Sequence, residues 1–160
     1  RAQLKKLFPQ AVWTEFRGNV HTRLKKLAGG AADASVLSQA GLVRLKIDSY
    51  EGVQFRPLKP DVCVPAVAQG IIALQCRSCD TSYFRQFTHE PTNEIFALER
   101  AFLTELGGGC QSAYAANCDG NVFRIFHEDC GFEKIEFPSG AQFAQKLDIV
   151  KNLARKSANY

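Results

Sequence analysis

The chain has 160 residues, of which 46% are hydrophobic and 22% are charged, a composition typical of one globular domain or two small ones. No apolar run approaches the roughly 20 residues of a membrane span, and the first stretch, RAQLKKLF, lacks the apolar core of a secretory leader. The formal net charge of +4 at pH 7 is too small to argue for nucleic acid as a partner.

The first part of the chain alternates between helical and strand patterns. Apolar residues at helical spacing predict helices over residues 1–8, 21–28 and 39–45. For the second of these helices, Asn19 is the expected N-cap, and Gly29 and Gly30 are the expected end. β-branched and aromatic residues predict strands over residues 11–16 and 34–38. This α-β-α-β-α order indicates parallel strands joined by helical crossovers.

The pattern changes in the second part. A further buried strand is predicted over residues 71–76, followed by a long helix after Pro91. Alternating patterns after the turn pair Asp119-Gly120 predict strands over 121–128 and 132–137, and a helix closes the chain at 141–156. The apolar positions of the long helix recur at helical spacing: Ile95, Leu98, Phe102 and Leu106.

These patterns predict an α/β fold followed by an α+β fold. Residues 1–64 are assigned to part of an α/β domain with a parallel or mixed sheet, and residues 65–90 to a crossing segment. Residues 91–160 are assigned to a small antiparallel three-stranded sheet packed by helices.

Arginines gather around one predicted strand end. Arg17 follows the strand over 11–16, Arg23 lies in the next helix, and Arg44 follows the next strand. Guanidinium groups beside a helix N-terminus form a cradle for a carboxylate or a phosphate. The alternative is a solvated basic face made by Arg23, Lys25 and Lys26.

The six cysteines are expected to be mostly reduced, because the chain shows no leader and is large enough for a core. Cys76 and Cys79 form a CxxC pair that could join His127 and Cys130 around zinc. Zinc is not expected, because His127 and Cys130 are predicted on a strand, where they would face opposite sides. The segment PAVAQG, residues 65–70, has the pattern of a turn at the entry of a strand.

A different kind of cysteine site is indicated by GGGCQ, residues 107–111. Three glycines free the backbone and remove side chains from around Cys110. An accessible thiol of this kind suits covalent attachment or nucleophilic catalysis, although an inert loop cysteine would have the same pattern. No partner pattern of a cysteine protease accompanies it.

Four motifs occur in order: R-G-N-V-x-T-R-L-x-K-L, A-G-L-x-R-L, P-A-V-x-Q-G and E-R-A-F-L-x-x-L-x-G-G-C-Q. In this order and spacing the chain resembles the C-terminal part of hydroxymethylbilane synthase, also called porphobilinogen deaminase. The resemblance implies most of a second, periplasmic-binding-protein-like domain and a third domain that carries the cofactor. It also implies a cytoplasmic enzyme, or one associated with a plastid or mitochondrion in a eukaryote, that is a monomer at full length.

The resemblance implies a transferase of haem biosynthesis that joins four porphobilinogen molecules into hydroxymethylbilane and releases ammonia. Cys110 would hold a dipyrromethane cofactor by a thioether, with its carboxylates bound by Arg17 and Arg23. Porphobilinogen and its oligomers would be bound by Arg44, Gln69 and Gly70. No metal, membrane or nucleic acid is implied.

The sequence departs from the family in several places. The family's catalytic aspartate has no counterpart, Ala68 replaces a usual glycine, and the motif V-P-I-G after the cysteine is replaced by Ser112-Ala113-Tyr114-Ala115. We therefore expect this chain not to be a complete catalyst by itself. The alternative from a different class is a non-catalytic module that binds carboxylates or a tetrapyrrole.

Overall fold

The computed structural model describes residues 1–107 and 114–158. The chain divides into two compact units. The short unit is Pro9–Leu58, and the long unit combines Arg1–Phe8 with Lys59–Tyr160. No helix among the described residues is both long enough and apolar enough to cross a membrane.

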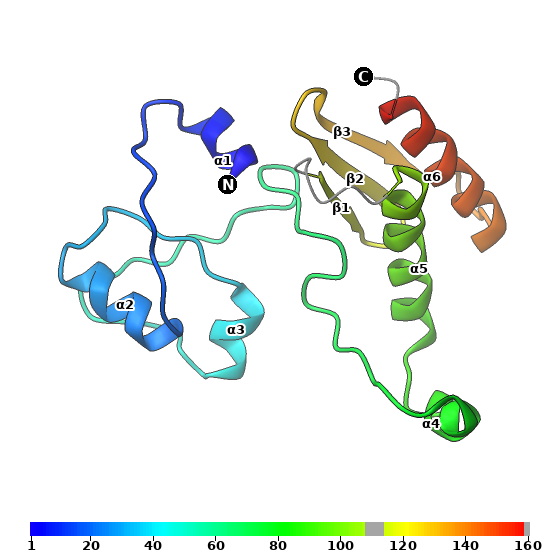
Figure 1. Ribbon diagram of the computed structural model, residues 1–160, viewed down its shortest axis with the longest axis horizontal. Coiled ribbons are helices and arrows are strands. Elements are labelled where there is room, and N and C mark those ends of the chain that lie inside the picture. The colour runs from blue at the N-terminus through cyan, green and yellow to red at the C-terminus, as the bar shows by residue number, and fades with distance from the viewer. Residues whose placement is uncertain (108–113, 159–160) are drawn as a thin grey trace. The chain divides into compact units, whose positions relative to one another are not determined.

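Two predicted helices form in the short unit: α2 (Val20–Ala28) and α3 (Gln39–Arg44) (Figure 1). The predicted cap of α2 is confirmed, since Oδ1 of Asn19 accepts a hydrogen bond of 2.8 Å from the backbone N–H of Thr22. Gly29 ends α2 as predicted, and its N–H donates to the carbonyl of Lys25 at 3.0 Å. Local signals thus determine both boundaries of α2.

The strands predicted over 11–16, 34–38 and 71–76 are wrong, because the structure gives all three segments an irregular conformation. A strand persists only where a neighbouring strand accepts and donates its backbone hydrogen bonds, and none pairs with these segments among the described residues. Their apolar side chains are left in water: Val12 is 91% exposed and Ile72 is 76% exposed. The expected parallel or mixed sheet is therefore absent from the described residues.

The long unit contains the sheet and most of the helices. Its three strands are hydrogen-bonded in the order β1-β2-β3, and both pairs are antiparallel, which confirms the predicted small antiparallel sheet. Strands β2 and β3 match the predicted ranges, whereas no range was predicted for β1. The elements are α1 (Ala2–Leu7), the 3₁₀ turn η1 (Ser78–Asp80), α4 (Thr81–Arg85), α5 (Glu90–Glu105), β1 (Tyr114–Cys118), β2 (Val122–His127), β3 (Gly131–Glu136) and α6 (Phe143–Ser157).

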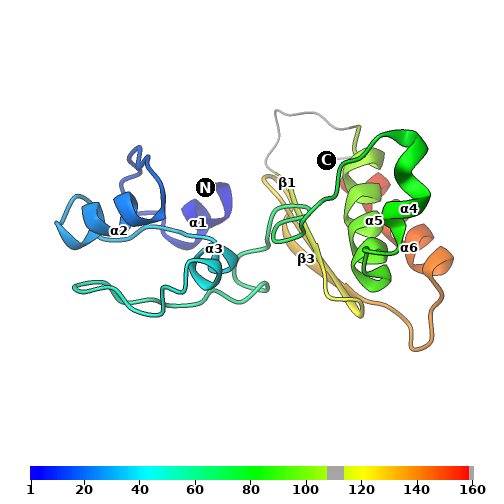
Figure 2. The same ribbon diagram turned by 90° about the horizontal axis from the view of Figure 1, so that it is seen from below.

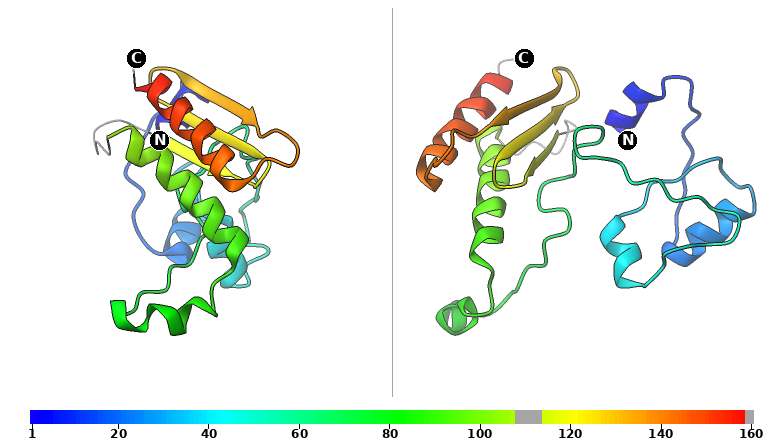
Figure 3. Two further views of the ribbon diagram at one scale, coloured as in Figure 1. Left: turned by 90° about the vertical axis from the view of Figure 1, so that its right-hand side faces the viewer. Right: turned by 180° about the vertical axis from the view of Figure 1, so that it is seen from behind.

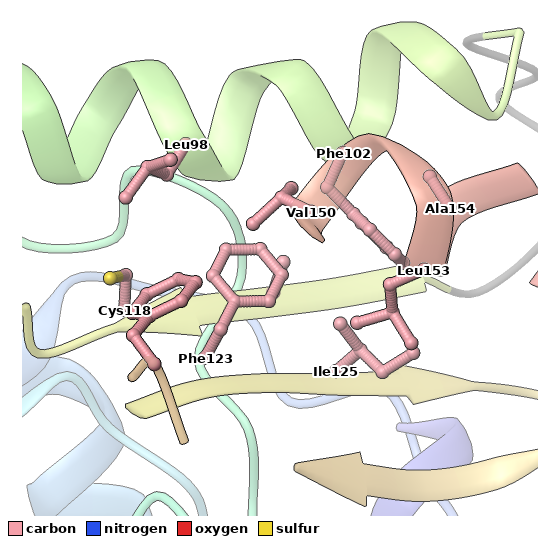
Figure 4. Packing of buried hydrophobic residues seen from close by; sticks show 10 residues of the cluster. Leu98, Phe102, Cys118, Phe123, Ile125, Val150, Leu153 and Ala154 are labelled. Carbon is pink, nitrogen blue, oxygen red and sulfur yellow. The ribbon is translucent and has the colours of Figure 1, made fainter. Parts of the chain in front are cut away.

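Helices α5 and α6 lie side by side on one face of the sheet (Figures 2 and 3). Their apolar residues meet those of β1 and β2 in the main core of the long unit (Figure 4). The rings of Phe102 from α5 and Phe123 from β2 are fully buried, with centroids 5.8 Å apart. The other core residues are Leu98, Ala116, Cys118, Ile125, Phe137, Val150, Leu153 and Ala154.

The opposite face of the sheet is covered by α1 and by the segment that begins at Lys59. Val64 packs with Ala115 and Phe126 in a second, smaller cluster. The side chain of Gln3 fixes this segment, because its Nε2 donates to the Val64 carbonyl at 2.8 Å and its Oε1 accepts from the Val64 N–H at 2.7 Å. Both faces of the sheet are thus covered within the long unit.

An ion-pair cluster fixes the same segment to the sheet. The guanidinium of Arg124, whose side chain is only 13% exposed, pairs with Asp61 and with Asp119. Lys134 on β3 also contacts Asp61, with Nζ 3.2 Å from Oδ2. These cations hold the pKa of the Asp61 carboxyl below its usual value. Asp61 is therefore ionised at neutral pH and joins the segment to two neighbouring strands.

Candidate cofactor- and carboxylate-binding residues

Arg23 makes more side-chain hydrogen bonds than the other two predicted binding arginines. It extends from α2, and its Nη2 donates to Oγ of Ser35 and to the carbonyl of Val36, each over 2.7 Å. Its Nε is buried and has no hydrogen-bond partner among the described residues. A buried donor without a partner costs free energy, and a carboxylate that reached this edge of the guanidinium would remove that cost.

Arg17 and Arg44 belong to the same short unit, but each is exposed and held by a near neighbour. Nε of Arg17 lies 3.0 Å from Oε2 of Glu15, and the Arg17 side chain is 87% exposed. Nε of Arg44 donates to the Ala40 carbonyl over 3.2 Å. The exposed ion pair of Arg17 contributes little stability, and Arg44 is exposed with a single bond to a backbone carbonyl, so both guanidinium groups remain available to a dicarboxylate.

Gln69 and Gly70 lie in the long unit, within a tight turn. The Gln69 N–H donates to the Ala66 carbonyl at 2.9 Å, and the Gln69 side chain accepts from the Ala66 N–H at 3.2 Å. Two residues of the turn adopt left-handed backbone conformations, Ala68 with φ +61° and Gly70 with φ +90°. Gly70 is suited to this conformation because it has no Cβ, whereas Ala68 is strained there.

Glu99 is a residue of this region that the sequence reasoning missed. It is 3% exposed on α5, and its two carboxylate oxygens accept from the backbone N–H groups of Ala68, at 2.7 Å, and Cys118, at 2.8 Å. One carboxylate therefore joins the Gln69–Gly70 turn to the end of β1. Burial raises the pKa of Glu99, and the two N–H groups oppose that rise.

A signal for Glu99 was present in the sequence. It stands four residues after Ile95 and three before Phe102, which places a carboxylate on the apolar face of the predicted helix. A charged residue in that position is seldom tolerated without partners. The pattern alone did not reveal which donors those partners are, because both come from other segments.

Replacing Ala68 by glycine is expected to stabilise the long unit by about 0.5–1 kcal/mol. The change removes a left-handed strain of about 1–2 kcal/mol, and the greater freedom of glycine in the unfolded chain offsets part of that gain. Ala66→Gly is the matched control, since Ala66 is in the same turn but outside the positive-φ region. Urea denaturation followed by circular dichroism should show Ala66→Gly as neutral or destabilising. A loss of stability in Ala68→Gly would contradict the backbone strain inferred for Ala68.

The cysteines fall into distinct environments. Cys110, the predicted anchor, lies outside the described residues. Cys118 is buried in the core, and burial raises the pKa of its thiol. The described cysteines are not joined in disulfides: Cys63, Cys76, Cys79, Cys118 and Cys130.

One expectation about these cysteines is wrong. His127 and Cys130 do not face opposite sides, because the turn after β2 folds Sγ of Cys130 back to 3.2 Å from Nδ1 of His127. In the described part of the chain, however, no group of three or more His, Cys, Asp or Glu side chains is arranged to hold a metal ion.

A family model described as "Porphobilinogen deaminase, dipyromethane cofactor binding domain" matches residues 1–85, which is more than half of the chain. The chain belongs to the porphobilinogen deaminase family. The match contains the three arginines, Gln69 and Gly70.

Individual members of the porphobilinogen deaminase family agree with this match. The porphobilinogen deaminase of Sphingopyxis alaskensis is 42% identical over 118 residues, which are 72% of this chain and 36% of that protein. That of a Roseiflexus species is 42% identical over 112 residues, 68% of this chain and 36% of that protein. The probable porphobilinogen deaminase of Methanocaldococcus jannaschii is 44% identical over 119 residues, 72% of this chain and 39% of that protein. The chain thus spans little more than a third of the length of these relatives.

Proposed function

We propose that the protein contributes to a transferase of tetrapyrrole, and hence haem, synthesis that condenses four porphobilinogen molecules into hydroxymethylbilane and releases ammonia. The observation that carries the proposal is the Arg23 guanidinium, which is anchored through Nη2 while its buried Nε has no partner among the described residues. Every pyrrole of the substrate and product carries an acetate and a propionate. A guanidinium suits such carboxylates, because its planar N–H groups can donate paired hydrogen bonds to the two oxygens of a carboxylate.

The donor set also fits a dipyrromethane, which is the cofactor named by the matching family model. In this proposal Arg17 and Arg23 bind its carboxylates, and Cys110 holds it by a thioether. When bound, the group supplies the pyrrole to which the first porphobilinogen is joined. Arg44, Gln69 and Gly70 contact the porphobilinogen units, and the family's catalytic aspartate has no counterpart in this sequence.

The proposal extends to domain organisation. Residues 1–64 belong to the substrate-binding α/β domain with its periplasmic-binding-protein-like sheet, 65–90 to the crossing segment and 91–160 to the cofactor-bearing domain. The full-length enzyme acts as a monomer in the cytoplasm.

Replacing Arg23 by glutamine is expected to weaken the binding of porphobilinogen or a synthetic dipyrromethane carboxylate about tenfold or more. A hydrogen bond to a charged group contributes about 1.5–3 kcal/mol, and each 1.4 kcal/mol is a factor of ten. Trp13, the only tryptophan, lies in the same unit, so its fluorescence can report the titration. Lys25→Gln is the matched control, because it removes one exposed charge from α2. Equal weakening by both variants would indicate a general basic face instead.

Loading of the cofactor is tested by intact mass. The purified chain is expected to carry the added mass of a dipyrromethane and to give a colour reaction with Ehrlich's reagent. Both should be lost in Cys110→Ala and retained in Cys79→Ala, which removes an exposed thiol elsewhere in the chain. An adduct that persists in Cys110→Ala would contradict Cys110 as the anchor. Conversion of porphobilinogen to a uroporphyrinogen precursor by the isolated chain would contradict its expected incompleteness.

A further inference from the structure

The turn between β2 and β3 brings an exposed thiol onto a buried imidazole. His127 ends β2, Cys130 precedes β3, and Sγ of Cys130 lies 3.2 Å from Nδ1 of His127. The backbone N–H of Cys130 also donates to Nδ1, over 3.3 Å. Nδ1 therefore faces both the thiol and the N–H of Cys130, so it is the ring nitrogen placed to take the thiol proton.

The rest of the ring is held in place. The His127 side chain is 4% exposed, and its ring stacks on Tyr114, the residue opposite it on β1, with centroids 4.6 Å apart. Its Nε2 lies 3.7 Å from Oδ2 of Asp129. When Nδ1 takes a proton, the Asp129 carboxylate therefore faces the positive ring. The arrangement has a nucleophile, a base and a group that stabilises the charged base.

The other described cysteines lack this combination. Cys118 is buried, and burial raises the pKa of its thiol, which keeps it protonated. Cys63 and Cys76 are half-buried. Cys79 is exposed like Cys130, but no histidine is hydrogen-bonded to it among the described residues. Cys79 is therefore an internal reference for an ordinary surface thiol.

We propose that Cys130 is a redox-modification site that exchanges with a low-molecular-weight disulfide such as glutathione disulfide. The proton on Sγ passes to Nδ1 of His127, and the thiolate attacks one sulfur of the disulfide. A new S–S bond forms on Cys130 as the S–S bond of the reagent breaks, and the departing thiolate takes the proton back from the imidazolium. The cysteine is oxidised and half of the reagent is reduced, so no further oxidant is required.

The test is the rate of modification of each cysteine in the folded chain at pH 7, with glutathione disulfide as the probe and peptide mass mapping as the readout. Cys130 is expected to react about threefold faster than Cys79 or more, because the imidazole beside Cys130 accepts the thiol proton during the attack. His127→Gln should reduce the Cys130 rate to that of Cys79. The matched control is His89→Gln, which removes an exposed histidine that is hydrogen-bonded to Thr92 and should change neither rate.

Three results would overturn the proposal. The first is equal rates for Cys130 and Cys79 in the folded wild-type chain. The second is an unchanged Cys130 rate in a His127→Gln chain with native circular dichroism. If that variant does not fold, the wild-type rates are compared with and without guanidinium: an advantage of Cys130 that disappears on unfolding supports the proposal, and one that persists overturns it. Dithiothreitol should reverse the modification, as expected for a disulfide.

Discussion

Replacing Glu99 by alanine is expected to lower the free energy of unfolding of the long unit by about 3 kcal/mol. The change leaves the N–H groups of Ala68 and Cys118 without the acceptors that now lie at 2.7 and 2.8 Å. A buried donor without a partner costs about 1–3 kcal/mol, and here there are two. Urea denaturation followed by circular dichroism measures the loss. Tryptophan fluorescence is not suited to this measurement, because Trp13 lies in the other unit.

The matched control is Glu94→Ala, the same substitution at an exposed position of the same helix. It should change the free energy of unfolding by no more than about 0.5 kcal/mol, as is usual for surface substitutions. Equal losses in Glu94→Ala and Glu99→Ala would mean that helix α5, and not the two acceptor bonds, is responsible.

The pH dependence of the Glu99 contribution has a defined sign. Burial raises its pKa above the ordinary value of 4.5, so the folded state binds this proton more tightly than the unfolded chain. The stability linked to this proton is complete below pH 4.5 and is lost as the pH rises through the raised pKa. The difference in unfolding free energy between wild type and Glu99→Gln should therefore decrease from pH 4.5 upward. A difference that increases with pH would contradict this sign.

Replacing Phe102 by alanine is expected to cost about 4 kcal/mol of stability, a large part of the total for a small domain. Its ring is fully buried between the sheet and α6 and packs on Phe123. Removing it leaves a cavity that the surrounding core fills only in part. Thermal unfolding should show the loss as a much lower midpoint.

Phe96→Ala is the control for this prediction, because Phe96 is on the same helix but 41% exposed. Its loss should stay below about 1.5 kcal/mol, since much of the ring is already in water. Similar losses for the two phenylalanines would contradict the position of the core between α5, α6 and the sheet.

Several elements of the fold were predictable because their signals are local. Asn19 and Gly29 delimit α2 through bonds to residues three or four positions away. The Asp119-Gly120 pair forms the predicted turn before β2, with Oδ1 of Asp119 accepting from the N–H groups of Asn121 and Val122. Such contacts need no partner from elsewhere in the chain.

The errors concern strands, whose stability depends on pairing. Residues 11–16 have strand-type side chains, but without a neighbouring strand they are irregular in the structure. Conversely, β1 contains Ala115, Ala116 and Asn117, residues with low strand preference, and it forms because β2 pairs with it along its whole length. Pairing partners therefore outweigh intrinsic preference in both directions.

For the candidate site, the sequence by itself determined the family motifs, and with them Arg17, Arg23, Arg44, Gln69, Gly70 and Cys110 as the residues to examine. Only the tertiary structure decided that Arg23 is anchored with a buried free Nε, that Glu99 joins the Gln69–Gly70 turn to β1, and that His127 contacts Cys130. The physical reason is that hydrogen bonds and burial at these positions depend on segments brought together by folding, whereas a motif records only residue type and spacing.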